Sequence, residues 1–368
     1  MRSANEIDFW RGLALVSIFI NHIPGVAYER LTHRNYGLSD SAELFVFLAG
    51  WAMRLVADGS MSERVGLVRL TLRLGARAVT IYAAQILITM LGIALIAGAA
   101  IVLHNPLLLE WHNAAAIFQE PVAAHVGVVA LTHQLGYFDI LPLYVVLMLG
   151  APALAIIHHL APQAVLPLSL SVYCVALGLG ANLPTWPVEG MWFFNPFAWQ
   201  LIFVLGFVLA GSDGPAVFVR RHFGWFKLVG IFGVVLGAYL ALSDYAPDPL
   251  RVPRPTLFFT FDKTFLSPAR LLHFLALAAA FAGTFLYVRR FARPLARYLS
   301  MLGRNSLNVF CVGSLLSLAG QLARFSFGGN VLVDTVVVSC GLAALGLTAW
   351  LSELRDRLRQ AQPAFAPA

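Results

Sequence analysis

The sequence predicts an all-α integral membrane protein with about ten transmembrane helices, and its composition carries that prediction. Of its 368 residues, 59% are hydrophobic and 12% are charged, and the mean hydropathy is +0.77. Soluble globular domains average about 25% charged residues. The apolar residues extend along nearly the whole chain, which excludes a soluble enzyme, a disordered chain and a disulfide scaffold. We therefore expect one polytopic membrane domain over residues 1–354 and a flexible cytoplasmic tail over 355–368.

The individual spans follow from the length that a bilayer requires. A spanning helix needs about 20 mostly apolar residues. The stretch 122–133 is too short to span and is expected to lie in the interface or to re-enter. The predicted spans are 10–29, 42–57, 78–103, 138–157, 164–182, 197–211, 224–243, 269–288, 305–323 and 331–351.

The distribution of basic residues predicts the orientation of these helices. With the N-terminus in the cytoplasm, 18 of the 25 Lys and Arg residues fall on the inner side, and the long connection 104–137 contains none. Cytoplasmic loops of membrane proteins carry such an excess. An even number of helices then places both termini in the cytoplasm. This bias and the anionic lipid headgroups explain the net charge of +7, so we expect membrane lipid and no nucleic acid as a partner.

Cysteines and histidines indicate neither a disulfide framework nor a metal site. Cys174, Cys311 and Cys340 each lie in an apolar stretch, where cysteine behaves as a small hydrophobic residue. The four histidines between residues 104 and 133 lack the compact spacing of zinc ligands. We therefore expect no bound metal.

The first predicted span carries ionisable residues that a bilayer disfavours. Arg11 and His22 are eleven residues apart, or about three helical turns, so both lie on one face. Asp8 shares that face. Ionisable groups inside a bilayer are costly and mark functional sites. Arg11 has a second interpretation, pairing with Asp8 at the inner interface, whereas the depth of His22 predicts a functional role.

Two carboxylates, Asp40 and Glu43, open the second predicted span. In one interpretation they cap the helix, because carboxylates are favoured in the first turn. In the other, one of them orients His22 and raises its basicity, as acids do beside a catalytic base. Both interpretations stay open at this stage.

Other polar residues lie at predicted helix starts, in loops or along one helix. Arg304 and Asn305 open the ninth span, where free N–H groups can receive an anion. Arginines at 69, 73 and 77 recur every fourth residue, which predicts a lipid-facing stripe or a phosphate-binding patch. The aromatic loop 182–196 suits either an interface belt or stacking on sugar rings. The candidates for substrate binding are Asp8, Asn21, Trp186, Trp192, Gln200, Lys263 and His273.

Several of these motifs resemble a known family. The string Ile7-Asp8-Phe9-Trp10-Arg11-Gly12-Leu13-Ala14, followed by His22, resembles the opening of the membrane-bound acyltransferase-3 superfamily. The segments 39–47, 195–201 and 303–307 resemble its OpgC-type branch. The resemblance extends over residues 5–350 and is most specific in the first 50.

The resemblance implies an O-acyltransferase that crosses the bacterial inner membrane several times. It implies transfer of a succinyl group, or another acyl group, from cytoplasmic acyl-CoA such as succinyl-CoA to an osmoregulated periplasmic glucan, with no tightly bound cofactor. Arg11 and His22 match the functional residues of the family, and we expect His22 to be the general base. Direct transfer and an acyl-histidine intermediate both stay open. The residues expected to bind the donor are Arg69, Arg73, Arg77, Arg304 and Asn305.

A transporter is the competing class of function. A proton-coupled transporter or flippase of a glycan or a small anion also has many helices and ionisable groups at membrane depth. The sequence shows no inverted repeat, and its titratable groups cluster in the first two spans, which favours the enzyme. Transport would move substrate without acyl-CoA, whereas the enzyme would release free CoA. The oligomeric state stays open.

Overall fold

The computed structural model describes residues 4–61 and 66–361. Within these ranges the chain is helical, with no strand and one isolated bridge between Pro184 and Met191. The all-α class is therefore confirmed. Residues 355–361 of the expected tail continue the last helix, and residues 362–368 lie outside the described residues.

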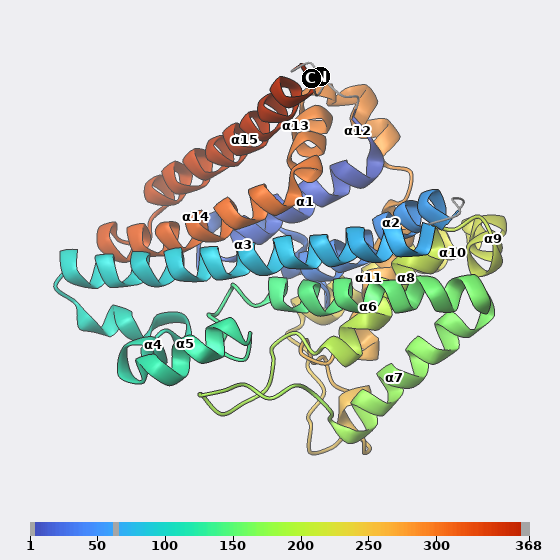
Figure 1. Ribbon diagram of the computed structural model, residues 1–368, viewed down its shortest axis with the longest axis horizontal. Coiled ribbons are helices and arrows are strands. Elements are labelled where there is room, and N and C mark those ends of the chain that lie inside the picture. The colour runs from blue at the N-terminus through green and yellow to red at the C-terminus, as the bar shows by residue number, and fades with distance from the viewer. Residues whose placement is uncertain (1–3, 62–65, 362–368) are drawn as a thin grey trace, which may run out of the picture. The chain divides into compact units, whose positions relative to one another are not determined.

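Figure 1 shows the helices in chain order. The α-helices are α1 (Glu6–Asn21), α2 (Ser41–Met61), α3 (Gly66–Val102), α4 (Ala115–Gln119), α5 (Pro121–Val129), α6 (Ile140–Leu160), α7 (Val165–Leu179), α8 (Pro196–Ala210), α9 (Gly214–Arg221), α10 (Phe223–Leu242), α11 (Pro268–Phe281), α12 (Phe285–Phe291), α13 (Arg293–Arg304), α14 (Ser306–Phe327) and α15 (Val331–Ala361). The 3-10 helices are η1 (Ala27–Leu31), η2 (His33–Tyr36), η3 (Pro106–Asn113), η4 (Pro162–Ala164) and η5 (Thr256–Phe258).

Six helices in the described ranges are long and apolar enough to cross a membrane, or up to eight if each of two bent pairs counts as one span. The six are α3, α6, α7 together with η4, α10, α14 and α15. The bent pairs are α8 with α9 and α11 with α12. Each predicted span contains a described helix, but α1 has only 16 residues and α2 carries charges near both ends. The chain is thus a helical membrane protein, and ten spans with both termini in the cytoplasm stay a prediction.

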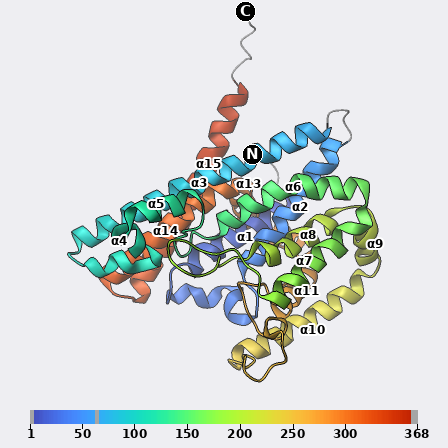
Figure 2. The same ribbon diagram turned by 60° about the horizontal axis from the view of Figure 1, so that its bottom comes forward.

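The chain divides into two compact units, which are described separately. Unit 1 comprises residues 1–32 and 283–368, and unit 2 comprises residues 33–282. In unit 1, α1 packs against α13 and α14, and α14 packs against α15 (Figure 1). In unit 2, α2 packs against α8, α3 against α6, and α10 against α11 (Figure 2).

In unit 1, α1 crosses α13 at very short range because a glycine on each helix faces the backbone of the other. A Cβ atom added to Gly12 would lie 1.9 Å from the carbonyl oxygen of Leu299. One added to Gly303 would lie 1.9 Å from the carbonyl oxygen of Asp8. Small residues let helix backbones approach closely where there is little hydrophobic force to hold them together. This crossing fixes the first turns of α1 on α13.

Unit 2 uses the same device between α2 and α8. A Cβ added to Gly50 would lie 1.8 Å from the carbonyl oxygen of Phe203, and one added to Gly206 would lie 2.0 Å from that of Phe47. Because the residue numbers rise on one helix as they fall on the other, the two helices run antiparallel. The crossing holds α2, whose first turn carries Glu43, against a helix of buried aromatic and aliphatic side chains.

The first helix begins and ends earlier than the predicted span 10–29. It begins after Asn5, whose side-chain oxygen accepts a hydrogen bond from the amide of Asp8 at 2.9 Å. It ends at Asn21, because Pro24 has no amide hydrogen to continue the ladder and Gly25 adopts a φ of 74°. His22 is therefore the residue that follows the helix, and not a residue within a continuous span.

Candidate functional site

His22 lies in unit 1, at the C-terminal end of α1, and its backbone is held on both sides. Its amide donates to the carbonyl oxygen of Ile18 at 3.0 Å. Its carbonyl oxygen accepts a hydrogen bond from Nε2 of Gln321 on α14 at 2.6 Å. The residue is half-buried. A half-buried imidazole on a fixed backbone suits proton exchange with a hydroxyl group.

The turn that follows His22 is clamped by an ion pair between α14 and α15. Arg324 pairs with Oδ1 of Asp334, and its other terminal nitrogen donates to the carbonyl oxygen of Gly25 at 2.8 Å. Oδ2 of Asp334 accepts the amide of Ala27 at 2.7 Å. Asp334 is only 3% exposed. Because these contacts fall three and five residues after His22, they fix where its turn can lie.

The other predicted residues on α1 are Asp8, Arg11 and Asn21, and two of them form hydrogen bonds within the fold. Asn21 is buried, and its side-chain oxygen accepts a hydrogen bond from the Thr32 hydroxyl at 2.7 Å. Asp8 accepts a hydrogen bond from the side chain of Asn5 at 2.5 Å. Arg11 is half-buried on α1. The predicted roles of Asn21 and Asp8 in substrate binding and of Arg11 in catalysis stay predictions.

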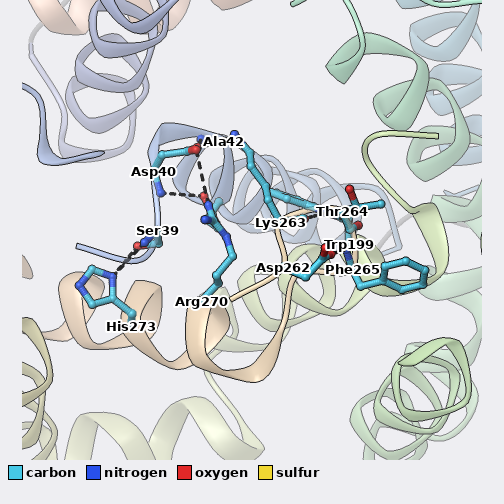
Figure 3. A network of polar contacts seen from close by, with 11 residues as sticks. Ser39, Asp40, Ala42, Trp199, Asp262, Lys263, Thr264, Phe265, Arg270 and His273 are labelled. Carbon is cyan, nitrogen blue, oxygen red and sulfur yellow. Dashed lines mark hydrogen bonds and ion pairs between the residues drawn. The ribbon is translucent and has the colours of Figure 1, made fainter. Parts of the chain in front are cut away.

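Unit 2 holds a cluster of charged side chains around the start of α2 (Figure 3). Glu43 is completely buried, and its Oε1 accepts two hydrogen bonds from Arg270 of α11, at 2.6 and 3.0 Å. Asp40 pairs with Nζ of Lys263 at 2.5 Å and with Arg270 at 3.5 Å. Two carboxylates are thus held by two cations from a segment more than 200 residues later in the chain.

The same carboxylates cap α2, as the first of the two interpretations predicts. The amide of Asp40 donates to Oε2 of Glu43 at 3.0 Å, and the amide of Ala42 donates to Oδ1 of Asp40 at 2.9 Å. This reciprocal arrangement satisfies two amides at the helix start. Burial raises the pKa of the Asp40 carboxyl, but Lys263 and Arg270 outweigh burial and hold that pKa well below its ordinary value. Asp40 is therefore an anion. The second interpretation, in which Asp40 or Glu43 orients His22, stays a prediction.

His273 lies one turn after Arg270 and contacts the residue that precedes Asp40. Its Nδ1 accepts a hydrogen bond from the amide of Ser39 at 3.2 Å and lies 2.8 Å from the Ser39 hydroxyl oxygen. Because an amide can only donate, Nδ1 carries no proton, and the ring proton is on Nε2. Cβ atoms added to Gly37 or Gly237 would lie 2.3 or 2.2 Å from the ring. The imidazole therefore packs tightly between Gly37 and Gly237, beside the cluster.

The predicted aromatic loop reaches the same cluster through Lys263. Nζ of Lys263 lies 5.6 Å from the ring centroids of both Phe193 and Phe194. Such cation–π contacts favour a charged amine over the ring faces. Trp192 is 4% exposed, whereas Trp186 is 47% exposed. Of the two predicted tryptophans, Trp186 is thus the one that can meet a ligand from solvent.

Asp139, immediately before α6, belongs to the same neighbourhood and was missed by the sequence analysis. It is half-buried, and burial raises its pKa to about 6 despite the attraction of Lys263. Arg270 was missed as well, although its spacing of three from His273 at a helix start was a usable signal. Asp139 is a single acidic residue before an apolar segment, and its sequence context gives no comparable signal of a site.

The remaining predicted residues lie elsewhere. Gln200 joins α8 to α7, because its side chain accepts from the Ser169 hydroxyl at 2.6 Å and donates to the Ser169 carbonyl at 2.8 Å. Arg304 in unit 1 pairs with Glu353 at 2.7 Å, and the Asn305 side chain donates to a carbonyl of α13 at 2.9 Å. The predicted arginine stripe lies on α3 in unit 2, where all three side chains are exposed: Arg69, Arg73 and Arg77.

Comparison with known proteins identifies the family. A family model described as OpgC protein matches residues 3–357, nearly the whole chain. No match was found among the curated proteins or the solved structures with which the chain was compared. The family match confirms the resemblance to the OpgC-type branch, and the chain belongs to the OpgC protein family.

Proposed function

We propose that the protein is an acyl-CoA-dependent O-acyltransferase of the bacterial inner membrane. It moves a succinyl group from cytoplasmic succinyl-CoA to a hydroxyl of a periplasmic glucan. Membership of the OpgC protein family implies a transferase and suggests glucan succinyl transfer. The observation that carries the proposal is His22, a half-buried imidazole at the end of an apolar helix. Its backbone carbonyl accepts a hydrogen bond from Gln321.

In the proposed reaction, neutral His22 takes the proton from the acceptor hydroxyl as that oxygen attacks the thioester carbonyl. The tetrahedral intermediate collapses, the carbon–sulfur bond breaks, and the CoA thiolate takes the proton from the imidazolium. The products are the glucan ester and free CoA, and His22 returns to its starting state. Proton transfer by a positioned side chain contributes about 10²- to 10⁴-fold to such reactions.

Arg11 fits the far end of the donor better than the reacting carbonyl. It precedes His22 by eleven residues on one helix, which is about 16 Å at the rise of an α-helix. One small reacting group does not extend between two such positions, but a long, thin donor such as acyl-CoA does. We therefore assign Arg11 to donor binding and His22 to proton transfer.

The cluster in unit 2 suits the sugar acceptor. Three carboxyl groups (Asp40, Glu43 and Asp139) outnumber two cations (Lys263 and Arg270), so the cluster does not favour a polyanionic donor. Fixed carboxylates and amines beside aromatic rings suit neutral hydroxyl groups and the apolar faces of sugars. Asp40 and Lys263, with Trp186 exposed on the neighbouring loop, are the proposed acceptor contacts.

Product analysis tests the proposal. The purified protein in nanodiscs is incubated with a periplasmic-type glucan and either succinyl-CoA or acetyl-CoA, and the glucan is analysed by mass spectrometry. We expect succinyl esters that require both protein and donor. Acetyl esters alone would overturn the succinyl assignment. Glucan that crosses a proteoliposome membrane without acyl-CoA and without becoming esterified would favour the transporter instead.

A further inference from the structure

Unit 1 carries a surface of arginines with no carboxylate in its own segment. Residues 283–304, which contain α12 and α13, include no Asp or Glu. We call the four exposed arginines of this segment, Arg289, Arg290, Arg293 and Arg297, the arginine surface. Ion pairs in the described part of unit 1 are formed by other arginines, among them Arg304, Arg324, Arg355 and Arg357.

The arginine surface is anchored to the first turns of α1. The guanidinium of Arg289 lies 5.8 Å from the ring centroid of Phe285, and that buried ring packs on Phe9 of α1 at 5.3 Å. The amide of Gly283 donates to Oε1 of Glu6 at 3.3 Å. The surface therefore lies at the end of α1 that begins with Glu6, whereas His22 follows the other end.

The two arginines of α13 face outward together. Arg293 and Arg297 are four residues apart, so they lie on one face of the helix. The opposite face, with Leu299 and Leu302, is buried, and further along the helix the Ser300 hydroxyl donates to the carbonyl of Asn5 at 3.3 Å. A helix fixed in this way presents its two guanidinium groups without further ordering of the backbone.

The chemistry of four unneutralised guanidinium groups selects a ligand with several negative charges. The planar fork of arginine matches phosphate oxygens and binds them in pairs of charge-assisted hydrogen bonds. Two residues predicted for this role, Arg304 and Asn305, are instead engaged within the fold by Glu353 and by the carbonyl of Met301. The exposed arginines that precede them in the chain are the groups that can bind phosphate in this part of unit 1.

We propose that the arginine surface binds the phosphate groups of the acyl-CoA donor, whose arm then follows α1 from Arg11 toward His22. This inference rests on the proposed function. Phosphate headgroups of anionic lipids share the same chemistry, and exposed Phe291 and Tyr287 beside the arginines are also typical of a membrane interface. The test therefore separates the two sources of phosphate.

Binding of free CoA to the protein in zwitterionic nanodiscs, measured by calorimetry without acceptor, tests the inference. We expect R293Q/R297Q to raise the Kd for CoA about tenfold or more, because the variant loses two charge-assisted contacts. R293K/R297K, which keeps both charges but not the planar fork, is expected to have a Kd between those of the wild type and R293Q/R297Q. The matched control is R355Q/R359Q, which removes two exposed arginines at the same spacing on α15 and should leave the Kd unchanged.

A second ligand and a lipid arm complete the test. CoA that lacks its 3′-phosphate should bind to the wild type more weakly than CoA does. Its Kd should also rise less than that of CoA when the wild type is replaced by R293Q/R297Q. An unchanged Kd for CoA in a variant with wild-type melting behaviour overturns the inference. Loss of thermal stabilisation by anionic lipid, with CoA binding intact, overturns it in favour of headgroups. Arginine-dependent CoA binding in a protein that transfers no acyl group would uphold this inference and reject the proposed reaction.

Discussion

Arg270 donates two hydrogen bonds to a single carboxylate oxygen of Glu43, although the two residues lie 227 positions apart in the chain. The Glu43 side chain is 0% exposed and the Arg270 side chain 12% exposed. The pair ties the first turn of α2 to the first turn of α11, and it places Asp40 and Lys263 beside each other. The arrangement of the unit 2 cluster therefore depends on one buried ion pair.

Arg270→Ala should destabilise the protein by about 3–5 kcal/mol, because it leaves a fully buried carboxylate without its cation. Unfolding of the detergent-solubilised protein measures the loss. The double variant R270M/E43M should recover much of that stability, since no buried charge is then left uncompensated. A double variant that loses as much as the two single variants combined would show that the residues act independently.

The clamp after His22 should act on turnover more than on substrate binding. Asp334→Asn keeps the shape of the side chain but removes the charge that holds Arg324. We expect kcat to fall about 10- to 100-fold, since a small misplacement of a reacting group is enough for that loss. The KM for the donor should change little.

Arg324→Gln and the double variant R324Q/D334N provide the check on that prediction. Because the two side chains act as one clamp, the double variant should be no slower than either single variant. Multiplied losses in the double variant, or a rise in KM that accounts for the whole effect, would contradict a positioning role for the clamp.

The glycine crossing of α1 and α13 should tolerate no added methyl group. Gly12→Ala and Gly303→Ala each place a Cβ against backbone, and we expect a loss of about 1–3 kcal/mol for each. Gly98→Ala is the matched control on α3, because a Cβ there meets nothing within 4 Å. Thermal melting should show the control within about 1 kcal/mol of the wild type. A stable Gly12→Ala protein would mean that the two backbones do not approach this closely.

Asp139 should make stability depend on pH between about 4 and 6. Its pKa in the folded chain is raised from 3.8 to about 6, so the folded state holds the proton more tightly than the unfolded state does. Its contribution to stability is therefore fully present below about pH 4 and is lost as the pH rises through 6. Asp139→Asn should flatten the melting temperature over this interval and raise it at pH 7. If wild type and variant follow parallel curves, Asp139 does not titrate in this way.

The sequence predicted the helices well because span length and apolar character are local properties. Each predicted span contains a helix, and the main error, the span 10–29, has a local cause in Pro24 and Gly25. That error also changes how His22 is understood, since the residue follows α1 and does not sit within it. The proline and glycine were visible in the sequence and were outweighed by the apolar residues around them.

The sequence pointed most clearly to those site residues whose ionisable side chains lie in or beside apolar segments. His22, Asp40 and Glu43 stand out because ionisable groups are rare in apolar segments. Their pairing does not: Lys263 was expected only as a substrate-binding residue, and Arg270 resembles an ordinary charge outside the membrane. No property of one sequence shows which distant segment packs against α2. Arg324 and Asp334 were missed for the same reason, because a clamp on a backbone turn leaves no spacing pattern.

Release of free CoA tests the central claim, acyl transfer with His22 as the base, most directly. The protein in nanodiscs is given succinyl-CoA with and without glucan, as wild type, as His22→Ala and as His125→Ala, a control for an exposed histidine on α5. We predict glucan-dependent release by the wild type and by His125→Ala, and a fall of about 100-fold or more in His22→Ala. Wild-type turnover by His22→Ala, or release that does not depend on glucan, would contradict the claim.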